Sequence, residues 1–295
     1  MGLLRTQMVQ EMVLQGYSQQ SIKVYTLYVQ KFAQFFNKKP TEISELELRQ
    51  FFAYLYTNKS PFSIYLYYNA LLFFYSFHNM NSIMKTIPRP KRPVVIPAVL
   101  SQNEIKIFLN TCSDLKYKAF FTLIYSSGLR LTEGLMLKVH DIDFDRKLVH
   151  VNLSKGLKER YSIIGENTIN LLKEYIAIFK PTNYLFYNGN PHMIHKPMGL
   201  RSTQSKFQYY FSKTNINKKA HIHTLRHSFA THLLENNVNI FYIMQLLGHS
   251  SINTTLIYLH MQRLDLLNIA SPIDTIGINF PQKNVPVQLD LQFFT

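Results

Sequence analysis

The sequence contains few acidic residues, a single cysteine and no long apolar run. Asp and Glu number 17 against 32 Lys and Arg in 295 residues, a formal net charge of +15. A globular chain this basic most often binds a polyanion, and nucleic acid is the first candidate. The lone Cys112 excludes an internal disulfide framework and fits a reducing cytoplasm. The most apolar stretch, residues 64–77, contains Asn69 and is shorter than the ~20 residues of a membrane span, so we expect no membrane partner.

A basic, proline-rich segment divides the chain. Residues 88–93 read Pro-Arg-Pro-Lys-Arg-Pro and cannot be helical throughout. We therefore predict a small helical domain in residues 1–87, a linker in 88–100, a second domain in 101–274 and a disordered tail in 275–295. Apolar spacing and a Ser18 cap predict helices over 19–36, 45–56 and 63–77, and Ser101 with Glu104 forms a capping box that starts the second domain.

The second domain combines helical and strand patterns. Apolar residues in 224–235 recur at helical spacing, and Gly128 is typical of a helix end. Residues 148–153 and 161–164 favour two strands joined by a turn at Lys155-Gly156. We therefore expect a mainly α protein whose second domain carries a small antiparallel β-sheet.

Four ordered motifs carry the functional signal. Residues 221–234 read His-Ile-His-Thr-Leu-Arg-His-Ser-Phe-Ala-Thr-His-Leu-Leu, and residues 247–258 read Leu-Gly-His-Ser-Ser-Ile-Asn-Thr-Thr-Leu-Ile-Tyr. Upstream lie Ser-Ser-Gly-Leu-Arg-Leu-Thr-Glu at 126–133 and Ser-Lys-Gly-Leu-Lys-Glu-Arg at 154–160. Together they resemble the tyrosine recombinase (phage integrase) family, whose members cut and rejoin DNA through a tyrosine. Four motifs in order are a far more specific signal than one.

The resemblance extends over roughly residues 10–274. Residues 16–25, Gly-Tyr-Ser-Gln-Gln-Ser-Ile-Lys-Val-Tyr, are similar to the entry of the family's helical core-binding (SAM-like) domain. That implies a DNA-binding domain in residues 1–87 that clamps a duplex together with a catalytic domain in 101–274. It also implies double-stranded DNA as the partner and a tetramer on two DNA sites.

The chemistry of phosphodiester cleavage explains the residue types. Attack on the phosphorus builds negative charge on the non-bridging oxygens, and the paired donors of Arg130 and Arg226 suit those oxygens. The nucleophile would be Tyr258, whose phenol has an ordinary pKa of ~10 and needs help to lose its proton. The resemblance assigns that help to His223, protonation of the leaving 5′-oxygen to Lys155, and a hydrogen bond to the phosphate to His249. No metal or other cofactor is required.

Some assignments have rivals in the sequence. Glu133 lies three residues after Arg130 and could hold its guanidinium in place. Lys158 shares the hairpin with Lys155, where Ser154 replaces the family's usual glycine. Among 19 tyrosines, only the position of Tyr258 after Thr254-Thr255 selects it over the nearest alternatives, Tyr161 and Tyr242. His227 and His232 also follow the family pattern, and we expect them to serve packing and hydrogen bonds of the helix.

Two other classes of function compete with this interpretation. The histidines at 221, 223, 227 and 232, with those at 192 and 195, could form a metal site, although neither H-E-x-x-H nor a paired Cys motif is present. Residues 237–258 could form a helix-turn-helix in a DNA-binding protein without catalysis. The complete catalytic set argues against a mere binder. The sequence predicts a cytoplasmic site-specific recombinase, but it leaves open integration, transposition, dimer resolution or inversion. It also leaves open whether an amphipathic segment at 263–269 packs on its own domain or on a neighbouring protomer.

Overall fold

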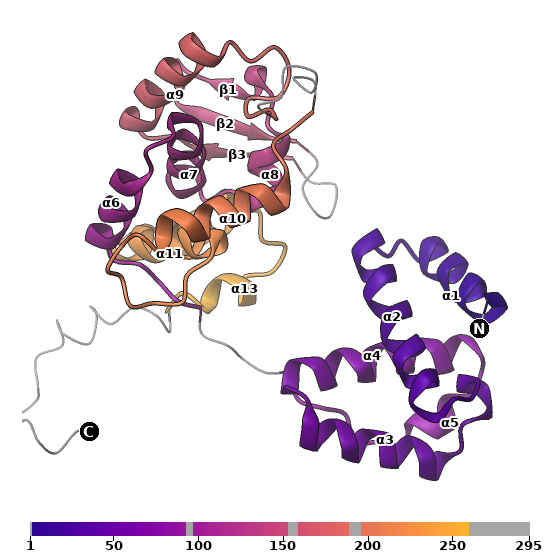
Figure 1. Cartoon of the computed structure of the whole chain (residues 1–295). Coiled ribbons are helices and arrows are strands. Elements are labelled where there is room, and N and C mark those ends of the chain that lie inside the picture. The colour runs from indigo at the N-terminus through magenta and orange to yellow at the C-terminus, as the bar shows by residue number, and fades with distance from the viewer. Residues whose placement is uncertain (1, 93–96, 153–158, 189–195, 260–295) are drawn as a thin grey trace, which may run out of the picture. The chain divides into compact units, whose positions relative to one another are not determined.

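The computed structural model describes residues 2–92, 97–152, 159–188 and 196–259. The chain divides into two compact units, Met1–Val95 and Ile96–Thr295 (Figure 1). Each unit has a hydrophobic core of its own. Within the described residues, every helix is too short or too polar to cross a lipid bilayer.

The N-terminal unit is all helical, and its core is built around α2 and α4. Both helices begin at serine caps, since Ser18 accepts from the Ser21 amide and Ser60 from the Ser63 amide. The predicted helices are confirmed to within two residues at each end. The elements are α1 (Gly2–Leu14), α2 (Gln19–Phe36), η1 (Pro40–Glu42), α3 (Glu45–Asn58), α4 (Pro61–Phe77) and α5 (Asn81–Met84).

Aromatic side chains fill this first core. The rings of Phe32 and Phe51 meet edge to face at 4.8 Å between centroids, which joins α2 to α3. Tyr75 on α4 is fully buried, and its hydroxyl donates to the Pro40 carbonyl at 2.9 Å. The high Tyr and Phe content of residues 1–87 therefore serves packing of a small helical domain.

The C-terminal unit is helical around a three-stranded sheet, which confirms the predicted fold class. Helix α7 lies at its centre and contacts α6, α8, α9, α11 and β3 (Figure 1). The helices are α6 (Gln102–Thr111), α7 (Leu115–Ser127), α8 (Leu131–Met136), η2 (Val139–Asp141), α9 (Glu166–Phe179), α10 (Leu200–Phe211), α11 (Ile222–Glu235), α12 (Ile240–Leu247) and α13 (Asn253–Leu256). The strands are β1 (Ile142–Asp143), β2 (Leu148–Val151) and β3 (Arg160–Ile163).

The sheet positions the predicted hairpin beside the end of α7. β2 pairs antiparallel with both β1 and β3, with Val149 opposite Ser162. The Ser162 hydroxyl donates to the Ser127 carbonyl at 2.7 Å, which fixes β3 to the last turn of α7. β2 and β3 confirm the predicted hairpin, whereas the two-residue β1 was not predicted. Lys155 and Lys158 lie outside the described residues.

The end of the linker belongs structurally to the C-terminal unit. Leu100 is fully buried, and its amide donates to the Ser228 hydroxyl of α11 at 2.9 Å. Directly afterwards, Ser101 and Glu104 form the predicted capping box at the start of α6.

Candidate active site

Helix α11 carries the central arginine of the site. Arg226 is 3% exposed, and its guanidinium donates to the carbonyls of Gly128 at 2.8 Å and Leu247 at 2.7 Å. These carbonyls stand at the C-terminal ends of α7 and α12, where a cation is favourable. Burial, followed by the charge of Arg130, lowers the pKa of Arg226 to about 10, so the guanidinium stays charged at neutral pH.

Three arginines converge on the last turn of α12. Each donates to one of the carbonyls of residues 246–248, which are left free because the helix ends there. The bonds run from Arg160 Nε to Leu246 (2.8 Å), from Arg226 Nη2 to Leu247 (2.7 Å) and from Arg130 Nη2 to Gly248 (3.4 Å). The main chain at the end of α12 therefore sets the spacing of the cationic groups.

Glu133 holds the same three arginines from the opposite side. Its carboxylate accepts from Arg130 at 2.6 Å and from both terminal nitrogens of Arg160 at 3.0 and 2.7 Å, and Arg226 lies at 3.7 Å. Burial alone would raise the pKa of Glu133, but the hydrogen bonds and charge of Arg160 and the hydrogen bonds of Arg130 lower it to about 2. One carboxylate among three guanidiniums orders them and leaves positive charge in excess, as an anion site requires.

Two glycines with positive φ make this arrangement possible. Gly128 ends α7 with φ +59°, and a Cβ there would lie 2.3 Å from the Phe229 ring. Gly248 ends α12 with φ +63°, and a Cβ there would lie 2.7 Å from the Arg160 side chain. Both glycines combine the left-handed conformation with close approach of a neighbouring side chain.

His249 follows the end of α12 and is held by two partners. Its Nε2 lies 3.1 Å from Arg226 Nη2, and its Nδ1 lies 2.8 Å from the Thr255 hydroxyl. A guanidinium can only donate, so Nε2 accepts, and Nδ1 carries the hydrogen and donates to Thr255. Burial, followed by the charges of Arg226 and Arg130, lowers the pKa of His249 to about 4, so the ring is neutral at pH 7.

Tyr258 lies against this group, two residues after the end of α13. Its amide donates to the Thr255 carbonyl at 3.0 Å, which brings the phenol over the His249 ring with 10° between the ring planes. The side chain is 2% exposed. Burial raises the pKa of the Tyr258 phenol, and the charges of Arg226 and Arg130 oppose that rise, so the resting phenol is protonated.

The remaining predicted residues differ in how the structure places them. His223 lies in the first turn of α11 with its side chain at the surface, and partial burial and the charges of Arg226 and Arg130 lower its pKa. In the described part of the chain, no hydrogen bond joins its ring to Tyr258. A hollow of about 630 Å³ opens beside Arg130 and Glu133, and its lining includes Asn152 and Glu159, which border the segment containing Lys155.

Three contributors were missed or misplaced by sequence reasoning. Arg160 was read only as the last residue of the hairpin motif, but it pairs with Glu133 across 27 residues. Thr255 was used only to mark the position of Tyr258, but it orients His249. His227 was expected to serve packing and helix hydrogen bonds, but its Nδ1 lies 3.0 Å from the Tyr258 hydroxyl. All three lie inside quoted motifs, which was the available signal.

The rival interpretations find less support in the described residues. No group of three or more His, Cys, Asp and Glu side chains there could hold a metal ion, while His192 and His195 lie outside the described residues. In the segment read as helix-turn-helix, the second helix, α13, has only four residues.

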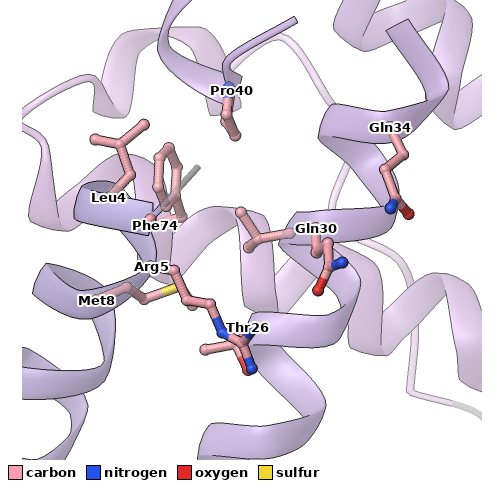
Figure 2. Close-up of a pocket in the computed structure, with 10 residues that line it drawn as sticks. Leu4, Arg5, Met8, Thr26, Gln30, Gln34, Pro40 and Phe74 are labelled. Atoms are coloured by element: carbon pink, nitrogen blue, oxygen red, sulfur yellow. The ribbon is translucent and has the colours of Figure 1, made fainter. Parts of the chain in front are cut away.

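A second hollow, of about 350 Å³, lies in the N-terminal unit between α1, α2 and α4 (Figure 2). Its lining is mostly apolar, with Leu4, Met8 and Phe74 around it, and Arg5 is the one charged residue among those that line it. The convergent arginines, His249 and Tyr258 lie instead in the C-terminal unit.

Comparison with known proteins identifies the family of the chain. The model of the phage integrase family matches residues 98–264, and that of the phage integrase N-terminal SAM-like domain matches residues 4–79. The chain belongs to the phage integrase family of tyrosine recombinases. It is 31% identical to a tyrosine recombinase of Thermosipho africanus (83% of this chain and 90% of the relative) and 32% identical to tyrosine recombinase XerA of Pyrococcus horikoshii (83% and 84%). The crystal structure of the XerH site-specific recombinase bound to difH substrate covers 83% of this recombinase and 77% of that chain, with TM-score 0.65 and 24% identity.

Proposed function

We propose that this recombinase cleaves double-stranded DNA by attack of the Tyr258 hydroxyl on a phosphodiester. The oxygen–phosphorus bond forms as the bond to the 5′-oxygen breaks, which leaves a 3′-phosphotyrosine that conserves the ester energy for rejoining. The observation that carries the proposal is the convergence of Arg130, Arg226, His249 and Tyr258 at the end of α12. All four residues also lie in the quoted sequence motifs.

The arginines would stabilise the charge that develops on the phosphate. Arg226 and Arg130 are held by backbone carbonyls and by Glu133, so little reorganisation is needed when DNA arrives. His249 accepts from Arg226. A bound phosphate would supply the negative charge that favours the protonated ring and a hydrogen bond to a phosphate oxygen. Glu133 supports these residues by holding the arginine side chains in place.

We propose that Lys155 donates a proton to the leaving 5′-oxygen. The support is the motif around Lys155 and the position of Asn152 and Glu159, which border its segment and line the hollow beside Arg130. A lysine can act as a general acid when it is held within hydrogen-bond reach of the leaving oxygen. Lys158 is the competing candidate from the same segment.

The N-terminal unit would bind the duplex. We propose that residues 1–87 form the DNA-binding domain, residues 88–100 a basic linker and residues 101–274 the catalytic domain, with four protomers assembled on two DNA sites in the cytoplasm. The basic linker and the net charge of +15 support backbone binding, which would be strongly salt-dependent. Integration, transposition, dimer resolution and inversion all use this same chemistry.

A covalent trapping experiment tests the proposal. The duplex is the sequence that the wild-type protein selects from a pool of random duplexes, nicked close to the scissile phosphate so that religation fails. We expect wild type to become linked to the 3′ end, also in excess chelator, because arginines balance the phosphate charge. Tyr258→Phe should bind the same duplex without becoming linked. A Tyr258→Phe variant that is still trapped refutes the assignment, and DNA binding without trapping by wild type favours a binder without catalysis.

A further inference from the structure

The imidazole of His249 is held between a cation and a buried hydroxyl. Its Nε2 lies 3.1 Å from Nη2 of Arg226, and its Nδ1 lies 2.8 Å from Oγ1 of Thr255. Thr255 is fully buried on α13, whereas His249 is partly exposed after the end of α12. One ring nitrogen therefore faces an arginine of the site, and the other faces the interior of the domain.

The state of this ring follows from what its two partners can do. Burial, followed by the charge of Arg226, lowers the pKa of His249 to about 4, so the resting ring is neutral and carries a single hydrogen. A guanidinium only donates, which makes Nε2 the acceptor and places the hydrogen on Nδ1. The hydroxyl of Thr255 accepts that hydrogen. An apolar side chain in its place would leave a buried N–H without an acceptor, which is unfavourable.

The main chain of Thr255 makes separate contacts. Its carbonyl accepts from the Tyr258 amide at 3.0 Å, and its amide donates to the Ile252 carbonyl at 2.7 Å. These two bonds shape the turn that leads to Tyr258, and neither involves the hydroxyl. A substitution that removes only the hydroxyl therefore changes the surroundings of His249 while it keeps the main-chain bonds before the nucleophile.

We propose that the Thr255 hydroxyl positions His249 for DNA cleavage, by fixing the orientation and the tautomer of the ring so that Nε2 faces the scissile phosphate beside Arg226. This inference rests on the proposed function. A ring turned by 180° would present a carbon to each partner, and the other tautomer would place an N–H against the donors of Arg226. With Nδ1–H bonded to Thr255, Nε2 stays on the arginine side, where a proton taken up with the phosphate would let it donate to a phosphate oxygen. Thr255 acts through His249 and does not itself contact DNA.

A second pair of a histidine and a hydroxyl supplies a matched control. Nδ1 of the buried His232 lies 2.8 Å from the hydroxyl of Tyr125 on α7. Tyr125→Phe therefore takes one hydroxyl from one imidazole, as Thr255→Val does, but the imidazole is not one that we assign to the phosphate. A purely structural role of such a hydrogen bond predicts the same consequences for both variants.

A double-mutant cycle on the rate of single-turnover cleavage tests the inference. The probe is the selected duplex, nicked close to the scissile phosphate. We expect Thr255→Val to cleave it ~10–10² times more slowly than wild type, the usual cost of losing the partner that orients a functional histidine. Thr255→Ser keeps the hydroxyl and should cleave at nearly the wild-type rate, as should Tyr125→Phe. In a His249→Ala background, Thr255→Val should have no further effect, because the ring through which the hydroxyl acts is gone.

Nitrogen-15 NMR of the imidazoles in the DNA-free protein reads the tautomer without any cleavage. The His249 signals, identified by their loss in His249→Ala, should show the hydrogen on Nδ1 in wild type and in Thr255→Ser, and should change in Thr255→Val but not in Tyr125→Phe. Thr255→Ala is a second variant in case Thr255→Val does not fold. A wild-type cleavage rate for Thr255→Val, the same loss of rate in the His249→Ala background, or unchanged His249 signals in Thr255→Val overturns the inference. A wild type that shows the expected tautomer but leaves no covalent product on DNA overturns the proposed function instead.

Discussion

Replacing Glu133 by glutamine removes the negative charge on which three arginines depend, while it preserves the shape of the side chain. The Glu133 side chain is 6% exposed and pairs with Arg130 and Arg160, with Arg226 at 3.7 Å. Its pKa falls from an ordinary 4.5 to about 2. At about 1.4 kcal/mol per pKa unit, the ionised carboxylate contributes about 3 kcal/mol to the stability of the C-terminal unit at pH 7. Cleavage should slow as well, because Arg130 loses its orientation.

The pH dependence of this contribution has a defined sign. The folded-state pKa of Glu133 is depressed, so its stabilisation is complete above the unfolded value near 4.5 and is lost as the pH falls towards 2. The difference between wild type and Glu133→Gln should be equal at pH 7 and 5.5 and smaller by about 1 kcal/mol at pH 3.5. Urea denaturation, followed by hydrogen exchange of α11 peptides, reports on the C-terminal unit alone.

An exposed ion pair supplies the control for Glu133→Gln. Glu166 pairs with Lys147, but its side chain is 59% exposed, and such pairs contribute little because water screens them. Glu166→Gln should therefore unfold at the wild-type urea concentration at each pH. Equal denaturation midpoints for Glu133→Gln and wild type between pH 7 and 3.5 would refute the account of the carboxylate as the organiser of the arginines.

Further substitutions test other parts of the site. Arg226→Lys should slow cleavage by on the order of 10²–10³ because the planar pair of donors is lost, with little change in DNA affinity; equal losses in single-turnover cleavage and gel-shift assays would contradict this. Cleavage by Lys155→Ala should be rescued by a DNA substrate with a 5′-bridging sulfur at the scissile position, because the thiolate leaves without a proton. Rescue of Lys158→Ala instead would move the acid role to that residue. Gly248→Ala should destabilise the C-terminal unit by more than the ~1–2 kcal/mol of a left-handed alanine, because its Cβ would meet an arginine side chain at 2.7 Å. Gly16→Ala is the control in thermal denaturation, because Gly16 has φ +72° and open space around it. Equal losses of stability in the two variants would refute the role of the close contact at Gly248.

Sequence periodicity and caps predicted the local structure well. The helix from Gln19 to Phe36, its Ser18 cap and the capping box at Ser101 depend on residues a few positions apart, and all three are present. The two main strands are present within one or two residues of their predicted ends. β1 has only two residues, too few for a period-two pattern to be recognised.

The arrangement of the site depended on contacts that no local pattern encodes. Glu133 beside Arg130 was foreseen because three residues separate them on one helical turn. The role of Arg160 was not foreseen, because its partners, Glu133 and the Leu246 carbonyl, are distant from it in the chain. Main-chain carbonyls at the end of α12 carry no residue-type signal. The placement of His227 on Tyr258 likewise required the approach of the segment after α13 to α11.

Identification of the residue that becomes linked to DNA is the most direct test of the proposed mechanism. Wild-type protein trapped on a nicked duplex is digested with protease and nuclease, and the nucleotide-bearing peptide is sequenced by mass spectrometry. We predict the added phosphonucleotide on Tyr258, in the peptide that also contains His249 and Thr255. The same modification on Tyr161, on Tyr242 or on any other of the 19 tyrosines would contradict the assignment of the nucleophile and of the site built around it.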